Sequence, residues 1–214
     1  MLKTGARSIL SAYAKNVPAV SAMQDSLEAA VELLTDCFAK GGMLLVCGNG
    51  GSCADADHIV GELIKSFRME RPLEAGFLAS LPREGRGALL AKRLQGGLPA
   101  INLGAQCALI TAMINDVDGD YIFAQQVAAY GRPGDVLLGI STSGNSENIL
   151  LAGAAAKAKG LKTLGLTGRD GGAVRREFDV ALCVDADSVE DIQDLHSTVY
   201  HAICGAVEYQ FWGD

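Results

Sequence analysis

Residues 136–146 read VLLGISTSGNS, an apolar run that ends in a loop of small and hydroxylated residues, here called the hydroxyl loop (residues 141–146). A second stretch has the same plan, because the apolar run Met43–Cys47 leads into the glycine loop (residues 48–52). A strand, a small-residue loop and a helix start can together hold phosphate, since backbone N–H groups and the positive end of the helix dipole point at the anion. The hydroxyl loop is not followed by the lysine of a nucleotide-binding phosphate loop. The pattern favours a small phosphorylated metabolite over a nucleoside triphosphate.

Short apolar runs alternate with helical patterns along the whole chain. The predicted strands are residues 43–47, 99–103, 135–140, 162–166 and 180–184. Such alternation is typical of parallel sheets with helices on both faces, and ligands of such sheets bind at the carboxyl ends of the strands. Both loops lie at such ends. The sequence therefore predicts an α/β fold, a three-layer αβα sandwich with a five-stranded parallel sheet.

The sequence predicts a single domain over residues 1–214, with an N-terminal helical segment and one insertion. Apolar residues at helical spacing predict a helix over about 19–39, stopped by Gly41 and Gly42, within an N-terminal helical segment of about 1–40. The stretch 71–98 is irregular, with a short helix predicted over 88–94. An insertion of this length is typical of a lid, an interface arm or a mobile segment, and a tolerated surface insertion is the alternative.

The overall composition and charge limit the classes of partner that the chain is expected to bind. The chain has 214 residues, a net charge of −7 and a pI of about 5.0. It shows no basic stripe, so no nucleic-acid partner is expected, and no apolar run approaches the ~20 residues of a membrane span. No secretory signal is visible, which makes the cytoplasm the expected compartment. The six cysteines form no CxxC pair, so neither a cysteine zinc site nor a disulfide framework is expected.

All three histidines, His58, His196 and His201, lie on two predicted helices that are candidates for a site. The helix expected after the glycine loop, with Ser52 as its predicted N-cap, carries His58 and Glu62 four residues apart and so on one face. Such a pair suits a divalent metal or a proton-transfer site, and a hydrogen-bonded surface pair is the alternative. The last helix is predicted to begin at Ser188, where Asp191 completes a capping-box spacing.

That last helix carries Gln193, His196 and His201. Gln193 and His201 are two turns apart and are able to approach one ligand, but His196 is only three residues from Gln193. Spacing alone does not choose between the two histidines. A structural histidine in an amphipathic helix is the alternative for either.

The hydroxyl loop is the stronger of the two phosphate candidates. It places four hydroxyls in six residues, from Ser141, Thr142, Ser143 and Ser146, although these residues and their glycine neighbour are also ordinary turn formers. In the glycine loop, Gly50 and Gly51 are expected to offer backbone N–H groups to the ligand.

These motifs together resemble the sugar isomerase (SIS) fold and, within it, the phosphoheptose isomerases. The resemblance covers nearly the whole chain and rests on several motifs in one order: Cys47–Ser52, His58 with Glu62, Asn115–Asp116, Gly131–Asp135, Gly139–Ser146, Leu166–Gly172, and Ile192–Gln193 with His196 and His201.

The resemblance implies an activity and a set of site residues. It implies interconversion of sedoheptulose 7-phosphate and glycero-manno-heptose 7-phosphate by a homotetramer with sites between subunits and one Zn²⁺ per subunit. It places the metal ligands at His58, Glu62, Gln193 and His201, and so selects His201 over His196. It places phosphate contacts at the four hydroxyls named above. Further substrate contacts are implied at Asn49, Ser52 and Asp116.

Ketose–aldose isomerisation through an enediol needs one group for the carbon-bound proton and another for the oxygen-bound proton. We expect Glu62 to be the base and His201 the acid, with the metal as a Lewis acid. Glu62 cannot be a tightly held ligand and a free base at the same instant. Its coordination is therefore expected to change during turnover, or the metal to be partly structural.

Two departures from the family pattern bear on the substrate. Segment 71–98 is longer than the family usually has, and residues 102–107 replace a stretch usually rich in Thr, Ser and Asp. The alternative function is that of a non-catalytic SIS protein that binds a phosphosugar or a protein partner, such as a replication initiator. Retention of both Glu62 and His201 argues against it.

Overall fold

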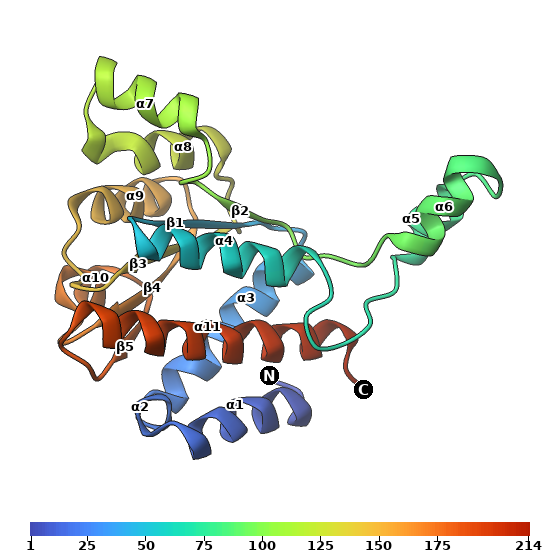
Figure 1. The fold of residues 1–214 in the computed structure, drawn as a ribbon, viewed down its shortest axis with the longest axis horizontal. Helices are drawn as coiled ribbons and strands as arrows, with labels where there is room; N and C mark the ends of the chain where they lie inside the picture. Colours follow the sequence, from blue (N-terminus) through green and yellow to red (C-terminus); the bar gives the residue numbers. More distant parts are fainter.

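The computed structural model describes residues 1–214 and is built around a five-stranded sheet in the order β2-β1-β3-β4-β5 (Figure 1). Every neighbouring pair of strands is parallel. The strands are β1 (Leu44–Gly48), β2 (Ala100–Asn102), β3 (Val136–Ser141), β4 (Lys162–Gly168) and β5 (Val180–Val184). Each strand begins and ends within two residues of its predicted bounds, so the predicted parallel sheet is confirmed.

The strand order places the two predicted loops side by side. The chain leaves β1 for β2 on one side and returns to β3 on the other, so β1 and β3 flank the point where the strand order reverses. In register, Cys47 pairs with Gly139 and Gly48 with Ile140, so the two strands end together. Ligands in open parallel sheets bind at such a switch point. The glycine loop and the hydroxyl loop therefore begin next to one another.

Helices cover both faces of the sheet, which confirms the predicted three layers. One layer packs α3, α4 and α11 on side chains such as Val46 and Leu138, with α1 and α2 outside it. The other packs α8, α9 and α10 on side chains such as Leu45 and Leu137. The helices are α1 (Thr4–Asn16), α2 (Pro18–Ser21), α3 (Gln24–Ala39), α4 (Gly51–Ile64), α5 (Ala75–Ser80), α6 (Gly85–Arg93), α7 (Cys107–Asp116), α8 (Ile122–Tyr130), α9 (Glu147–Ala158), α10 (Gly172–Glu177) and α11 (Val189–Trp212), with a 3₁₀ turn η1 at Gly119–Tyr121. None of them combines the length and the apolar character needed to span a lipid bilayer.

The N-terminal helical prediction is right in type but wrong in continuity. The single helix expected over 19–39 is two helices, α2 and α3, separated at Ala22 and Met23. There the Met23 N–H donates to the Val20 carbonyl, three residues back, which is a tighter turn than the α-helix uses. The helix ends before the predicted glycine stop, with Gly41 at a positive φ of 77°.

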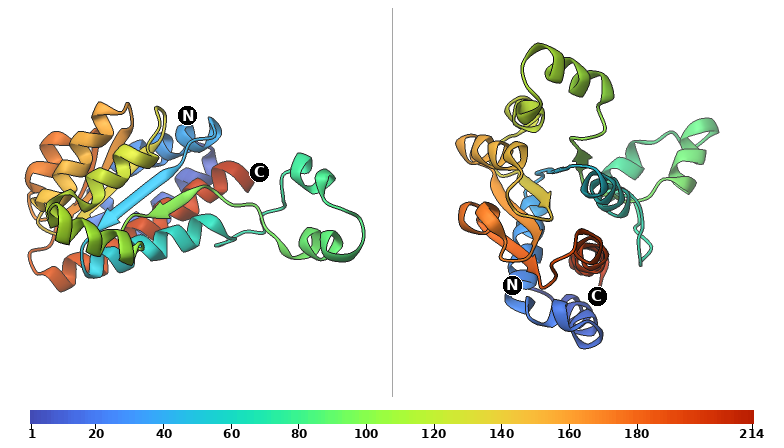
Figure 2. Two further views of the ribbon diagram at one scale, coloured as in Figure 1. Left: turned by 90° about the horizontal axis from the view of Figure 1, so that it is seen from above. Right: turned by 60° about the vertical axis from the view of Figure 1, so that its left-hand side comes forward.

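The irregular segment forms an arm, defined here as residues 73–97. Its helices α5 and α6 stand away from the rest of the chain (Figures 1 and 2). Gly87 is its only buried residue, and the apolar side chains of Phe77, Leu89 and Leu94 are exposed. The short helix predicted over 88–94 is α6, and α5 was not predicted.

A buried ion pair closes the base of the arm. Arg71 Nε donates to Glu208 Oε1 over 2.7 Å, and neither side chain is exposed. Glu208 also accepts the backbone N–H groups of Phe67 and Arg68, while Arg71 donates to the carbonyl oxygens of Glu62 and Leu63. The pair therefore joins the end of α4, the following segment and α11.

We expect Arg71→Met to lower the free energy of unfolding by about 3–5 kcal/mol, because it leaves the Glu208 carboxylate buried without a counter-charge. The matched control is Arg7→Met, which removes the exposed pair between Arg7 and Glu28 and should cost less than about 1 kcal/mol. Urea unfolding of both variants measures the difference. Equal losses in the two variants would contradict the role given to the buried pair.

One histidine lies inside the core. His196 of α11 has no exposed surface, and neither ring nitrogen makes a hydrogen bond. Burial lowers the pKa of His196 to about 4, against a smaller opposing effect of the Thr167 backbone. His196 therefore packs as a neutral ring at neutral pH.

Between pH 6.5 and 4 the unfolded chain binds a proton at His196 that the folded chain does not. We therefore expect the free energy of unfolding to fall by about 3 kcal/mol from this group as the pH drops through that window. In His196→Gln the decline between these pH values should be shallower by that amount. Denaturant titrations at several pH values measure it, and parallel curves for the two proteins would count against a buried neutral histidine.

Candidate active site

Helices α4 and α11 lie side by side and run in the same direction (Figure 1). At their N-terminal ends, Gly51 of α4 meets Gln193 of α11. About two turns further on, His58 meets Tyr200 and His201. The candidate side chains from the two ends of the sequence are thus brought together by this one helix pair.

Three of the predicted side chains form a cluster between these helices. His58 Nε2 is 3.3 Å from Glu62 Oε1 and 3.4 Å from His201 Nε2. The Glu62 side chain is only 13% exposed, and its Oε2 is buried without a hydrogen bond. A carboxylate oxygen in this state is available to a proton or a metal ion.

The environment of His201 affects its protonation. Burial lowers the pKa of His201, and the nearby His58 and Arg68 lower it further, while Glu62 raises it. The ring of Phe67 also stacks on His201, with centroids 5.7 Å apart. His201 is therefore a neutral imidazole at neutral pH.

Two further groups belong to this cluster and were missed by the sequence analysis. The Tyr200 hydroxyl lies 2.9 Å from His58 Nδ1, and Asp55 lies close enough to the same hydroxyl to interact with it. Burial raises the pKa of Asp55, against the opposing effects of Tyr200 and His58. The available sequence signals are a tyrosine next to His201 and an aspartate three residues before His58.

The fourth proposed ligand, Gln193, lies elsewhere along the helix pair. Its amide packs on Gly51, where an added Cβ would collide with it. Gln193 and His201 are eight residues apart, which is about 12 Å along the helix axis. Gln193 makes no hydrogen bond to His58, Glu62 or His201, and no group of three or more His, Cys, Asp or Glu side chains is arranged to hold a metal ion.

The hydroxyl loop has a rigid frame. Ser141 Oγ and Ser146 Oγ are 2.9 Å apart, and α9 begins directly after Ser146. Gly144 has a φ of 65° and lies so close to the Gly171 carbonyl that a side chain would not fit. Asn145 accepts a hydrogen bond from the Ala173 N–H, which ties the loop to α10. Ser143 Oγ accepts the N–H of Asn145, whereas Thr142 makes no side-chain hydrogen bond.

The glycine loop differs from the prediction in one respect. The N-cap of α4 is Gly50, with a φ of 54°, so the assignment of Ser52 as the cap is wrong. Only glycine readily adopts this backbone, and Ser52 is instead a buried residue of the first turn. Asn49 forms a reciprocal pair of amide hydrogen bonds with Asn148 of α9, at 2.9 and 3.0 Å. This pair holds the two loops together.

The remaining predicted residues are placed as follows. Asp116 is exposed at the end of α7, where the Asn115 side chain donates to it, and nothing brings it to the cluster. Ser188 caps α11 and accepts the Asp191 N–H, so the predicted helix start is confirmed. Of the two alternative histidines, His201 is in the cluster and His196 is in the core.

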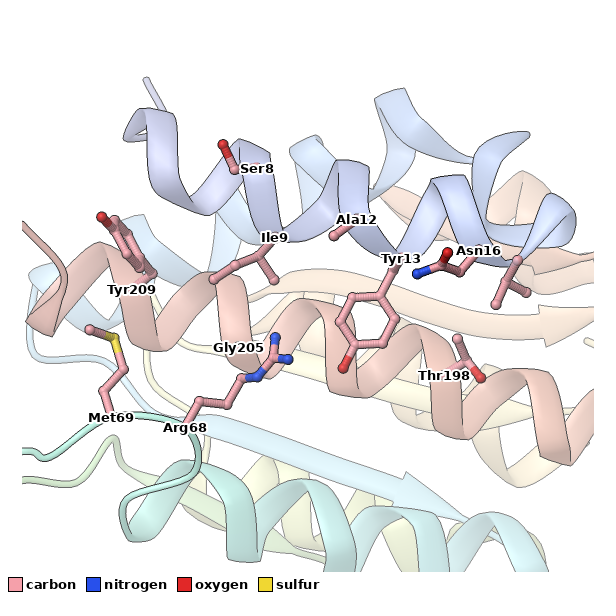
Figure 3. Close-up of a pocket in the computed structure, with 11 residues that line it drawn as sticks. Ser8, Ile9, Ala12, Tyr13, Asn16, Arg68, Met69, Thr198, Gly205 and Tyr209 are labelled. Carbon is pink, nitrogen blue, oxygen red and sulfur yellow. The ribbon is translucent and has the colours of Figure 1, made fainter.

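A hollow of about 840 Å³ lies along α1 and α11 (Figure 3). Its lining includes Ser8, Tyr13, Arg68 and Thr198, and the Arg68 guanidinium carbon lies 5.6 Å from the centre of the Tyr13 ring. The hollow borders the cluster through Arg68, whose charge lowers the pKa of His201. No residue of the hydroxyl loop lines it.

Comparison with known proteins gives consistent matches over most of the chain. Two SIS domain family models match, one over residues 11–96 and one over residues 81–202. A phosphoheptose isomerase of Thiobacillus denitrificans is 40% identical over 193 residues, which are 89% of this chain and 86% of that relative. One of Akkermansia muciniphila is 32% identical and is matched over 97% of both chains.

The solved structure of phosphoheptose isomerase GmhA from Neisseria gonorrhoeae has the same fold. Its superposition on this chain has a TM-score of 0.73 at 34% sequence identity and covers 89% of each of the two chains. The identities, coverage and fold all lead to one conclusion: the chain belongs to the phosphoheptose isomerase family of SIS-domain proteins.

Proposed function

We propose that this chain interconverts sedoheptulose 7-phosphate, a ketose, and glycero-manno-heptose 7-phosphate, an aldose, through an enediol. The observation that carries the proposal is the Glu62 carboxylate, with a buried unpartnered oxygen, next to His58 and His201. A phosphosugar-sensing protein would need the hydroxyl loop but neither of these acid–base groups. The resemblance to phosphoheptose isomerases in sequence and fold supports the same reaction.

The reaction moves two protons and changes no oxidation state overall. In the ketose-to-aldose direction, Glu62 removes a proton from C1, and the electron pair forms the C1–C2 double bond while the C2 oxygen takes a proton. Return of a proton to C2 and loss of the proton on the C1 oxygen then give the aldehyde. A positioned general base and acid typically accelerate such steps by about 10²–10⁴-fold.

His201 is suited to the oxygen-bound proton. Because burial lowers its pKa, it is neutral at neutral pH, with one nitrogen that donates and one that accepts. Such a ring is able to pass a proton between the two neighbouring oxygens of the enediol. Phe67, stacked on its face, restricts the ring orientation.

The hydroxyl loop is proposed to bind the 7-phosphate. Ser141, Thr142, Ser143 and Ser146 supply hydroxyl donors, and the N-terminus of α9 adds backbone N–H groups and its dipole. The fixed loop backbone supports this role, since a preformed site loses little entropy on binding. Asn49, Gly50, Gly51, Ser52 and Asp116 stay predictions as sugar contacts.

We further propose one Zn²⁺ per chain, held by His58, Glu62, His201 and Gln193. The donor types suit this ion, because imidazole nitrogens and carboxylate oxygens are common zinc ligands, and His58 Nε2 lies 3.3 Å from Glu62 Oε1 and 3.4 Å from His201 Nε2. Gln193 would have to turn away from Gly51 to join them. Zinc would act as a Lewis acid that stabilises the charge on the enediolate oxygens.

A homotetramer with sites between subunits is proposed as well, and the cytoplasm is the proposed compartment. The exposed apolar side chains of the arm, of Ile114 in α7 and of Val117 directly after α7 support association of copies.

For Glu62→Gln we expect the turnover of sedoheptulose 7-phosphate to fall by roughly 10²–10⁴-fold, because an amide does not accept the C1 proton. Binding of the sugar phosphate, measured by calorimetry, should persist because the hydroxyl loop is unchanged. The matched control is Glu70→Gln, at an exposed position outside the cluster, which should keep full turnover. Retained aldose formation in Glu62→Gln would refute the assignment of the base.

For the metal, we expect elemental analysis of the purified protein to give about one zinc per chain, lost on chelation together with turnover and regained with added Zn²⁺. His58→Ala should bind far less zinc, whereas His196→Gln should keep it, because His196 lies outside the cluster. Zinc absent from the unaltered protein, or fully retained in His58→Ala, would contradict the site.

A further inference from the structure

Most of the large hydrophobic side chains that are exposed gather in two short stretches. Of twelve such side chains, five belong to the arm: Phe77, Leu78, Leu89, Leu90 and Leu94. Three more lie at the end of α7 and just after it, in a segment here called the acidic turn (residues 114–121): Ile114, Val117 and Tyr121. The other four are scattered, and single exposed apolar residues are normal on a protein surface. The two gathered stretches are therefore the candidate contact surfaces.

The helices of the arm lack the packing that stabilises a short helix. Helix α5 has six residues and α6 has nine, and neither begins with a side-chain cap. Isolated helices shorter than about 12–15 residues are marginal in water, and in proteins the packing of an apolar face supplies most of their stability. Gly87 is the only buried residue of the arm. We therefore expect the apolar face of α6 to pack on a surface outside its own chain.

The exposed face of α6 is both apolar and basic. Arg86, Leu89, Leu90 and Arg93 share one side of the helix, because they lie three, four and seven residues from its first member. The four basic residues of the arm outnumber its two acidic ones, although the chain as a whole has a net charge of −7. The arm is therefore a cationic segment of an acidic protein.

The acidic turn has the opposite charge. It contains Asp116, Asp118 and Asp120, all exposed, and no basic residue. No ion pair in the chain includes a residue of the arm or of the acidic turn. The two stretches thus match one another in apolar character and complement one another in charge, which is the combination that fixes the orientation of two protein surfaces.

The two stretches lie apart within one copy of the chain. The arm precedes β2, whereas the acidic turn follows β2 and α7, and the arm and α7 project from different corners of the molecule (Figures 1 and 2). A two-fold axis between two copies would place each arm on the acidic turn of the other copy. Such an interface makes the same contact twice and closes on itself.

We propose that the arm of one copy docks on the acidic turn of a second copy, with the leucines of α6 against the apolar side chains of the turn and the arginines against its aspartates. The inference takes from the proposed function only that copies associate, and it adds which surfaces meet. An anionic lipid surface is the other occupant that a basic apolar helix suits. The acidic remainder of the chain disfavours it, because like charges repel.

The decisive experiment is cross-linking between two co-expressed, differently tagged versions of the chain. One carries Leu90→Cys in the arm and the other Val117→Cys in the acidic turn, and both carry Cys107→Ser, which removes an exposed native thiol. We expect a bismaleimide to join the two versions to each other. The matched control replaces Val117→Cys with Val189→Cys, an exposed position at the start of α11, and should give no mixed product. No cross-link between positions 90 and 117, or an equal yield in the control, would overturn the proposal.

Charge exchange tests the pairing of the two surfaces. Arg86→Glu with Arg93→Glu should raise the dissociation constant of the assembly by about 10-fold or more, because like charges then face each other. Asp118→Arg with Asp120→Arg should do the same, and all four changes in one chain should restore association. Sedimentation velocity measures each assembly, and circular dichroism checks that each variant is folded. Association that stays weak in the folded fourfold variant would overturn the charge pairing.

Two controls separate this interface from other causes. Lys40→Glu with Arg132→Glu reverses two exposed basic residues outside the arm and should leave the assembly unchanged. The unaltered protein should not co-sediment with phosphatidylglycerol vesicles. Vesicle binding that Arg86→Glu with Arg93→Glu abolishes would overturn the second copy as the occupant.

The outcome is independent of turnover, because none of these measurements uses the sugar phosphate. A protein that forms the cross-link but does not isomerise sedoheptulose 7-phosphate would refute the proposed function and keep this interface. An active isomerase without the cross-link would do the reverse.

Discussion

The geometry of the candidate site depends on the buried pair between Arg71 and Glu208. The pair fixes how far α4 lies along α11, because Arg71 binds the last carbonyl oxygens of α4 and Glu208 belongs to α11. One helical turn is about 5.4 Å, so a slip of one turn would separate His58 from His201, which are now in contact. The acid–base cluster thus relies on a contact outside it.

The same pair provides hydrogen-bond partners for two kinds of polar group that would otherwise be buried unpaired. The end of an α-helix leaves carbonyl oxygens without partners, and Arg71 satisfies those of Glu62 and Leu63. A buried carboxylate is costly unless it is fully hydrogen-bonded, and Glu208 receives Arg71 and two backbone N–H groups. One of those N–H groups belongs to Phe67, the ring stacked on His201. The order of the site and the stability of the core therefore have a common origin.

Local patterns predicted much of this architecture, and long-range contacts account for what they missed. The strands were predictable because buried parallel strands are short continuous apolar runs. His58 and Glu62 were predictable as neighbours because helical spacing is fixed. Helical spacing did not decide between His196 and His201, since that depends on which side of α11 meets α4. Asp55 and Tyr200 were missed for the same reason, and Ser52 was misassigned because Gly50 adopts a backbone that begins the helix earlier.

Both ends of the arm lie at this same junction, next to the Arg71–Glu208 pair. The Gly96 N–H donates to the Arg71 carbonyl, and the Leu98 N–H donates to the Leu63 carbonyl, so both ends of the insertion are tied within a few residues of one another. An insertion with adjacent ends adds length without moving the elements on either side, which explains why the sheet and the α4–α11 pair keep the family fold. Because Arg71 also binds the Glu62 carbonyl, the root of the arm is in direct contact with the helix end that carries the candidate base.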